Sequence, residues 1–315
     1  MAELIKLHVS ERTNLLERLF NEKNGITVVN NPAEAEYIIS QSNVKYPEYI
    51  SKTIYIASEP PRTEHRKWCY ENYDNFLLVV AHDADPNNPK HIRFQKDDEA
   101  QFYPVRADPY PFVTRSDTTL GSRGVFFAGM IDKNYNRRQK NLPRGATSIT
   151  HLRKLMGEYF LKNHPGSIMV GIGWNNQLHK NTKWRSEKLD IVADKNIDFV
   201  LALENTIHTN YLTEKIWDGF ASDKVTMYLG DPRIEHHIPL NCFLDLRPYY
   251  NRDTGDINID VLSNRLKTMT QNEYDSIINN ARSFRTKSKG KYLSYCIELT
   301  NRLIDYMKKN RKITS

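Results

Sequence analysis

The chain has 315 residues, of which 39% are hydrophobic and 11% aromatic, a composition that favours packed cores over intrinsic disorder. Because one hydrophobic core rarely supports a chain of this length, two domains are expected. The apolar runs are much shorter than the roughly 20 residues that cross a membrane, which excludes a membrane-spanning class. The three cysteines include no CxxC pair, so the sequence supports neither a disulfide framework nor a zinc site.

Short apolar segments alternate with an amphipathic one in the N-terminal part of the chain. Residues 11–22 carry Leu15, Leu19 and Phe20 at helical spacing, between apolar segments typical of strands. This alternation predicts a doubly wound parallel sheet. The expected strands are residues 4–9, 26–29, 37–39, 53–57 and 76–80. A polar stretch with five prolines follows over residues 82–122 and predicts loops that lead to a linker.

A second α/β unit is expected to begin at residues 123–129. A helix is predicted over about residues 149–162, and strands are predicted at residues 168–172 and 199–203. We therefore divide the chain into a first α/β domain over residues 1–118, a second over residues 119–290, and a C-terminal helix over residues 291–315.

Most of the net charge of +7 lies near the C-terminus. Residues 281–315 hold ten Lys or Arg against only Glu298 and Asp305. Apolar residues between Tyr292 and Met307 recur there at helical spacing, which predicts a helix with an apolar stripe and a basic fringe. Such a stripe usually packs on its own domain, and the alternative is contact with an anionic membrane surface. Nucleic acid is disfavoured because no recognition motif accompanies the charge.

The segment around residues 199–230 carries most of the functional information. Residues 199–203 predict a buried parallel strand that ends at Glu204 and Asn205, and ligands of open α/β sheets bind at such strand ends. Thr213 is the expected N-cap of the next helix, with Glu214 and Lys215 in its first turn. A helix N-terminus beside a lysine favours a nucleotide diphosphate. The alternative is an ordinary βαβ unit whose charged residues are solvated.

This segment resembles the donor-binding motif of the α1,3/α1,4-fucosyltransferases, glycosyltransferase family ten. Members carry a strand, Glu-Asn, a short loop, Tyr, one residue, Thr-Glu-Lys, an amphipathic helix, and a strand ending in Gly. The corresponding residues here are Glu204-Asn205, Tyr211, Thr213-Glu214-Lys215 and Gly230. The resemblance implies the GT-B fold, an α/β architecture in which two doubly wound domains face each other across a cleft. The first would bind the acceptor and the second the nucleotide sugar.

The resemblance also implies an activity. It is inverting transfer of L-fucose from GDP-fucose to a hydroxyl of a glycan, most often in α1,3 linkage, with an oligosaccharide, glycolipid, lipopolysaccharide or glycoprotein as acceptor. Two alternatives stay open. The chain is a GT-B transferase of the same ancestry with another nucleotide sugar, or it is an inactive sugar-binding or membrane-surface protein that keeps the fold.

Glu59 is the candidate general base. Residues 52–60 resemble the family strand that ends in Tyr-Thr-Gly-Glu, although Ser58 replaces the glycine and Pro60 follows the glutamate. A sugar hydroxyl needs a proton acceptor as it attacks, and a carboxylate at a strand end is suited to that role. The alternative is a glutamate in a turn with no chemical duty.

The remaining site assignments also follow from the resemblance. The family supplies an arginine at the head of a helix for the diphosphate, which here nominates Arg153, with Arg137 and Arg138 as competitors. Lys215 and the helix start at Thr213 would bind phosphate, while Asn205 and Glu214 would bind ribose or fucose hydroxyls. Tyr211 would pack beside the nucleotide, and Glu204 is a further donor-site candidate.

No metal cofactor is expected, because side-chain cations can neutralise the diphosphate, and Mn²⁺ would be at most stimulatory. The competing pattern is Asp83-Ala-Asp85, which resembles the metal-binding DxD of GT-A transferases. His236-His237 lacks partners at metal spacing and is expected to be solvated or at an interface. Residues 1–6 lack a signal-peptide profile. Animal and plant members of the resembled family carry an N-terminal membrane anchor, so the resemblance implies a cytoplasmic enzyme of bacterial or viral type, or else a trimmed chain, with peripheral membrane contact through the basic helix as an option.

Overall fold

A computed structural model describes residues 4–10, 20–41, 44–57, 64–81, 84, 87–93, 119–127, 138–139, 142, 145–174, 191–192, 196–288 and 291–311. The chain forms two compact units. Unit 1 comprises Met1–Asp97, Leu142–Gly145 and Gly290–Ser315, and unit 2 comprises Asp98–Asn141 and Ala146–Lys289. The C-terminal helix therefore belongs to the first unit rather than standing apart.

Unit 1 is built on a six-stranded sheet in the order β2-β1-β3-β4-β5-β6. All neighbouring strands pair in parallel, as the alternation of segments predicts. The strands are β1 (Ile5–Val9), β2 (Ile26–Val28), β3 (Tyr37–Gln41), β4 (Thr53–Ala57), β5 (Leu78–Ala81) and β6 (His91–Arg93). β6 lies in the stretch expected to form loops, and it was missed because it is a three-residue edge strand with no apolar alternation.

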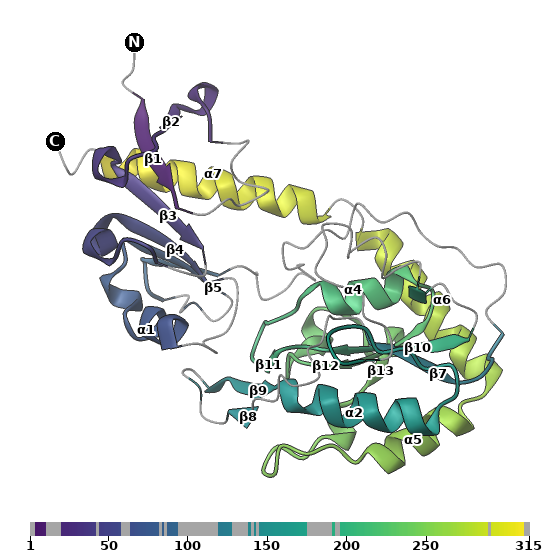
Figure 1. Cartoon of the computed structure of the whole chain (residues 1–315). Coiled ribbons are helices and arrows are strands. Elements are labelled where there is room, and N and C mark those ends of the chain that lie inside the picture. The colour runs from purple at the N-terminus through teal and green to yellow at the C-terminus, as the bar shows by residue number, and fades with distance from the viewer. Residues whose placement is uncertain are drawn as a thin grey trace. The chain divides into compact units, whose positions relative to one another are not determined.

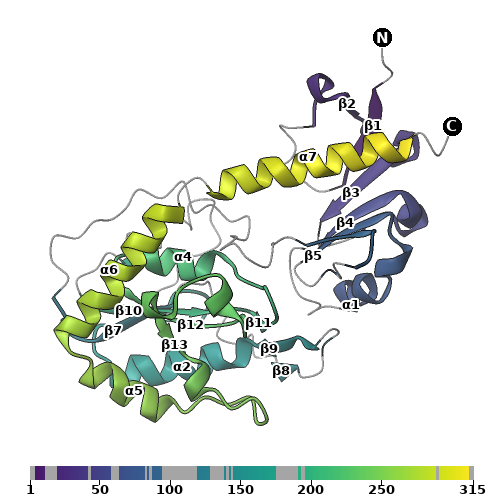
Figure 2. The same ribbon diagram turned by 180° about the vertical axis from the view of Figure 1, so that it is seen from behind.

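The two faces of this sheet are covered by helices from opposite ends of the chain. α1 (Glu64–Glu71) contributes Cys69 and Tyr70 to one core, while α7 (Lys291–Arg311) covers the other face. Figures 1 and 2 show α7 lying along β1 and β3. In the part of α7 whose side chains the structure describes, residues 297–311, the apolar stripe is buried in its own unit, in line with the first of its two interpretations. Its contacts with the sheet come from Leu299, Leu303, Ile304 and Met307.

Unit 2 contains a four-stranded parallel sheet in the order β13-β12-β10-β7. The strands are β7 (Gly124–Phe127), β10 (Ile197–Leu203), β12 (Val225–Leu229) and β13 (Leu244–Asp245). The strand expected at residues 168–172 is reduced to isolated bridge positions at Ile168 and Val170, the first of which pairs with Phe126. Gly171 adopts a φ value of 133°, which is incompatible with an extended strand.

Helices lie on both faces of this second sheet (Figures 1 and 2). α2 (Thr150–Asn163), α5 (Ile259–Thr268) and α6 (Gln271–Ser288) contribute to one core, and α4 (Glu214–Ala221) packs on the other face. α4 approaches β12 closely because Gly219 has no side chain, and a Cβ there would lie 2.2 Å from Oγ1 of Thr226. A small antiparallel sheet of β8 (Arg138–Gln139), β9 (Thr147–Ile149) and β11 (Thr206–Ile207) completes the unit.

Two parallel sheets with helices on their faces are the α/β architecture expected from the sequence. In the part of the chain that the structure describes, no helix has the length and apolar character needed to cross a membrane.

The role of α7 can be tested with Leu303→Ala. Leu303 is fully buried against the sheet, so its truncation should lower the free energy of unfolding by about 2–5 kcal/mol, measured by urea denaturation. Ile297 lies on the same helix with 41% of its surface exposed, and Ile297→Ala should change stability by no more than about 0.5 kcal/mol. Equal effects of the two substitutions would contradict the docking of α7.

Candidate functional site

The candidate site is organised around Glu204, the first residue after β10. All seven residues of β10 are buried, and Glu204 itself has 0% of its surface exposed. Space for its side chain comes from Gly230, which follows β12, because a Cβ at that position would lie 2.4 Å from Cγ of Glu204. The same Cβ would lie 2.4 Å from the hydroxyl of Tyr228. Gly230 is thus required for a carboxylate to fit between the ends of β10 and β12.

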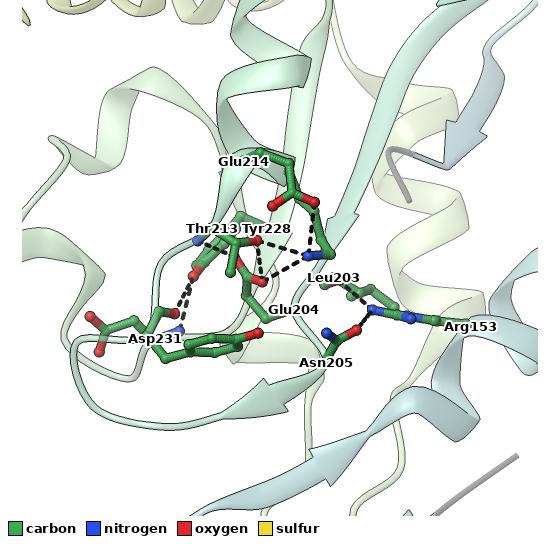
Figure 3. A network of polar contacts seen from close by, with 10 residues as sticks. Arg153, Leu203, Glu204, Asn205, Thr213, Glu214, Tyr228 and Asp231 are labelled. Carbon is green, nitrogen blue, oxygen red and sulfur yellow. Dashed lines mark hydrogen bonds and ion pairs between the residues drawn. The ribbon is translucent and has the colours of Figure 1, made fainter. Parts of the chain in front are cut away.

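The Glu204 carboxylate is held by the residues that begin α4 (Figure 3). It accepts hydrogen bonds from the backbone N–H of Thr213 at 2.8 Å and from the Thr213 hydroxyl at 2.7 Å. Thr213 occupies the N-cap position as predicted, but its side chain makes no capping bond to the helix. Its hydroxyl donates to Glu204 and accepts from the Lys215 ammonium instead, because buried charged groups need hydrogen-bond partners.

Lys215 lies beside this carboxylate and is also buried, with 6% of its surface exposed. Its ammonium contacts Oε2 of Glu204 at 3.3 Å, Oγ1 of Thr213 at 2.8 Å and Oε1 of Glu214 at 3.4 Å. Burial raises the pKa of the Glu204 carboxyl, and the Lys215 ammonium opposes that rise by favouring the charged form. The sequence thus places a buried ion pair, rather than a free lysine, at the start of α4.

Arg153 and Asn205 meet on another side of Glu204 (Figure 3). The Arg153 guanidinium donates from Nη2 to the carbonyl oxygen of Leu203 at 3.3 Å and to Oδ1 of Asn205. It also lies 5.5 Å from the centroid of the Phe127 ring, at the end of β7. Although Arg153 is on α2, it reaches the carboxyl end of β10. The structure therefore brings Arg153, Asn205, Thr213 and Lys215 to one end of one strand.

Two of the expected donor-site residues are more deeply buried than a ligand contact requires. Tyr211 is 1% exposed, and its carbonyl oxygen lies 3.5 Å from the hydroxyl of Tyr228. Glu204 has no exposed surface, so it orders Thr213 and Lys215 and has no face for a substrate. Glu214 remains partly exposed, with 26% of its side-chain surface open to solvent.

Other predicted residues cannot be placed by side chain. Glu59, Arg137, Asp83 and Asp85 lie outside the described residues, so their candidate roles stay predictions. The backbone of Arg138 lies in β8, opposite Ile149, which directly precedes α2. Within the ranges that the structure describes, no three His, Cys, Asp or Glu side chains form a group that could hold a metal ion.

The prediction for the histidine pair is wrong for one of its members. His236 is exposed, but His237 is 4% exposed, and its Nε2 lies 3.2 Å from Oδ2 of the fully buried Asp231. Residue spacing alone did not indicate this contact, because Asp231 and His237 lie in an irregular loop after β12. The sequence Gly230-Asp231-Pro232 directly follows a buried strand. Polar residues at strand ends line the ligand edge of a parallel sheet, so this segment was a usable signal that Asp231 lies near the site.

Part of the second unit is similar to a domain of known proteins. Residues 169–289 match the family model described as glycosyltransferase family 10 (fucosyltransferase) C-term. The curated relatives include 4-galactosyl-N-acetylglucosaminide 3-alpha-L-fucosyltransferase 9 from Bos taurus and from Homo sapiens, each 35% identical over 69 residues. These matches cover 19% of this chain and only 19% of the length of each relative.

Solved structures agree on the fold. Crystal structures of an alpha1,3-fucosyltransferase with GDP and with GDP-fucose superpose with TM-scores of 0.54 and 0.51. Each is 16% identical in sequence, and each match covers 88% of this chain and 81% of the other. At this identity the likeness concerns the fold, and it confirms the expected α/β architecture with two parallel sheets of the GT-B type.

The buried ion pair makes a sharp prediction for stability. Glu204→Gln keeps an acceptor for Thr213 but leaves the Lys215 ammonium buried beside a neutral amide, so the free energy of unfolding should fall by about 3–5 kcal/mol. Glu214 compensates only in part, because its contact is longer and partly exposed. The matched double variant Glu204→Gln/Lys215→Met removes both charges and should recover most of the loss in chemical denaturation. A double variant less stable than Glu204→Gln alone would refute the pairing.

Proposed function

Because residues 169–289 match the model of the C-terminal domain of glycosyltransferase family 10 (fucosyltransferase), we propose that the chain is a glycosyltransferase that moves L-fucose from GDP-fucose to a hydroxyl of a glycan. The observation that carries the proposal is the meeting of Lys215, Arg153 and the start of α4 at the carboxyl end of β10. Two cations and a helix N-terminus at such an edge suit a diphosphate. The name of the matched relatives supports an α1,3 linkage for the product.

The hydrogen bonds of Lys215 suggest how the donor would be received. An ammonium has three protons, and Lys215 faces three acceptors, of which Glu214 is the most distant at 3.4 Å and is partly exposed. A phosphate oxygen would therefore replace Glu214, while Glu204 and Thr213 keep the ammonium in place. The displaced Glu214 carboxylate would then accept hydrogen bonds from ribose or fucose hydroxyls.

Asn205 and Arg153 would act together. Arg153 already occupies Oδ1 of Asn205, so the amide nitrogen is the group of Asn205 that would donate to a ligand oxygen. The guanidinium, fixed by Asn205 and by the Leu203 carbonyl, would stabilise the charge that develops on the departing GDP. Arg138 remains an alternative source of this cation. The buried Tyr211 would pack beneath the loop before α4, beside the nucleotide, without a polar contact to the substrate.

Glu59 is the proposed general base. It lies two residues beyond β4, whose five residues are all buried, and strand ends line the ligand edge of parallel sheets. In the reaction, the acceptor oxygen bonds to the anomeric carbon as the bond from that carbon to the GDP oxygen breaks. The acceptor proton passes to the Glu59 carboxylate, and GDP leaves with the bonding electrons. Attack opposite the leaving group inverts the anomeric configuration.

The donor can be identified by calorimetric titration with GDP-fucose, GDP-mannose, UDP-galactose and UDP-xylose. Preference for GDP-fucose supports the proposal. Preference for another of the four would indicate a transferase of the same ancestry with a different sugar, because phosphate contacts alone do not read the sugar. An acceptor panel of oligosaccharides, glycolipids and glycoproteins would then test transfer and separate an active enzyme from an inactive sugar-binding protein.

Donor binding should depend on Lys215 apart from its role in stability. In the Glu204→Gln/Lys215→Met variant, GDP affinity should fall roughly ten- to hundred-fold, because a charge-assisted contact to phosphate contributes about 1.5–3 kcal/mol. Isothermal titration with GDP measures this loss in a protein whose fold is retained. Wild-type affinity in that variant would remove Lys215 from the donor site.

The base is tested by Glu59→Gln, which keeps size and hydrogen bonding but cannot accept a proton at neutral pH. We expect kcat to fall by about a hundred- to ten-thousand-fold while GDP affinity is unchanged. Steady-state kinetics and titration together measure both quantities. Near-normal turnover would exclude Glu59 and direct attention to Asp83 and Asp85.

Metal dependence distinguishes the two ways in which the charge of the donor diphosphate could be neutralised, by side-chain cations or by a bound metal ion. If Lys215 and an arginine neutralise it, most activity should survive EDTA. Complete loss on chelation, restored by Mn²⁺ and abolished by Asp85→Ala, would instead support the carboxylate pair at Asp83 and Asp85.

A further inference from the structure

The loop after β12 is tied to the loop before α4 by a buried polar cluster. His237, in the first of these loops, places its Nε2 3.2 Å from Oδ1 of Asn210, in the second, and 3.2 Å from Oδ2 of Asp231. Arg233 donates from Nη2 to the same Asn210 oxygen at 3.1 Å. His237, Asn210 and Asp231 are buried, with exposures of 4%, 5% and 0%. Because both neighbours of Nε2 are acceptors, this nitrogen is the one that carries the proton.

Asn210 has an unusual backbone conformation in the loop of residues 208–213, which precedes α4. Its φ of 60° lies in the left-handed region, which costs energy for a residue with a side chain even though asparagine tolerates it best. It immediately precedes Tyr211 and lies three residues before Thr213, whose N–H and hydroxyl hold Glu204. The conformation of Asn210 therefore sets the position from which Thr213 reaches the ion pair.

The loop that carries His237 is itself anchored to the sheet. Arg247, just after β13, donates from Nη1 to the carbonyl oxygen of Pro232 at 2.7 Å and to Glu235 at 2.5 Å. Its Nε also bonds Asp245 of β13 at 2.9 Å. Asp231 is held in turn, since its Oδ1 accepts the N–H of Arg233 at 2.9 Å and its own N–H donates to the Tyr228 hydroxyl at 3.1 Å. The loop that carries His237 is thus held in place by hydrogen bonds to β12 and to residues at β13.

We propose that His237 is a positioning residue of the donor site: its Nε2–H, donated to Asn210 beside the Asp231 carboxylate, helps to hold the loop of residues 208–213 so that Thr213 and Lys215 are presented to the nucleotide diphosphate. The proposal rests on the proposed function for the identity of the ligand. His237 contacts no reacting group and acts through Asn210. Arg233 donates to the same Asn210 oxygen at 3.1 Å, so the two side chains hold the loop together.

The test compares four variants. His237→Ala removes the tether, and His237→Gln restores an N–H donor of similar reach. Asn210→Gly keeps the left-handed backbone without strain but removes the accepting oxygen. His236→Ala is the matched control, because His236 is exposed on the same turn.

Two readouts are used. The first is titration with GDP together with donor KM and kcat. His237→Ala and Asn210→Gly should each weaken GDP binding and raise KM about ten-fold with kcat nearly unchanged, since one buried hydrogen-bonded tether is lost and the reacting atoms are not touched. His237→Gln should recover most of the affinity. The His237→Ala/Asn210→Gly double variant should be no worse than Asn210→Gly alone, because that substitution already removes the oxygen that His237 contacts.

The second readout is amide hydrogen exchange of residues 207–213 in the unliganded protein, which does not depend on the donor. Exchange should accelerate in His237→Ala and Asn210→Gly and stay at the wild-type rate in His236→Ala. The proposal is overturned if His237→Ala matches His236→Ala in exchange, if the two single effects add, or if His237→Gln fails to recover affinity. If the wild-type chain does not bind GDP, the proposed function fails, and the exchange rates still decide the role of His237.

Discussion

The buried ion pair between Glu204 and Lys215 is the constraint on which the rest of the site depends. Isolated charges are too costly to bury, so each must find its partner and each remaining hydrogen-bonding position must be filled. Thr213 meets both demands, because its hydroxyl donates to the carboxylate and accepts from the ammonium. The glycine at position 230 and the turn that presents Thr213 are further requirements of the same pair. The side chains at this strand end are therefore positioned by a carboxylate that has no exposed surface.

The sequence predicted the parallel sheets well because their strands are short, continuous apolar runs, which are typical of buried strands. It also predicted that Asn205, Thr213 and Lys215 share a strand end, since that follows from the order strand, loop, helix. It did not indicate that Glu204 and Lys215 pair with each other. A linear pattern places residues on an element but does not reveal that a carboxylate after a strand and an ammonium in the next helix will form an ion pair, as Glu204 and Lys215 do.

Long-range contacts in irregular segments mark the other limit. His237 and Asn210 are separated by two regular elements, α4 and β12, and neither histidine nor asparagine has a periodicity that would indicate burial. Similarly, the three-residue β6 pairs with β5 only because the sheet already exists. In both cases the stabilising contacts come from parts of the chain that are distant in sequence. The local sequence therefore does not predict either the contact of His237 or the formation of β6.

The path of α7 has a consequence for how the protein is made. The strands of unit 1 precede unit 2 in the chain, yet the helix that covers one face of their sheet follows unit 2 and is synthesised after it. During translation, the apolar side chains of β1, β3, β4 and β5 on that face stay uncovered by α7 until all of unit 2 has been synthesised. Exposed strands of this kind invite aggregation or chaperone binding. Removal of α7 would accordingly expose one face of the sheet in unit 1, while the core of unit 2 contains no residue of this helix.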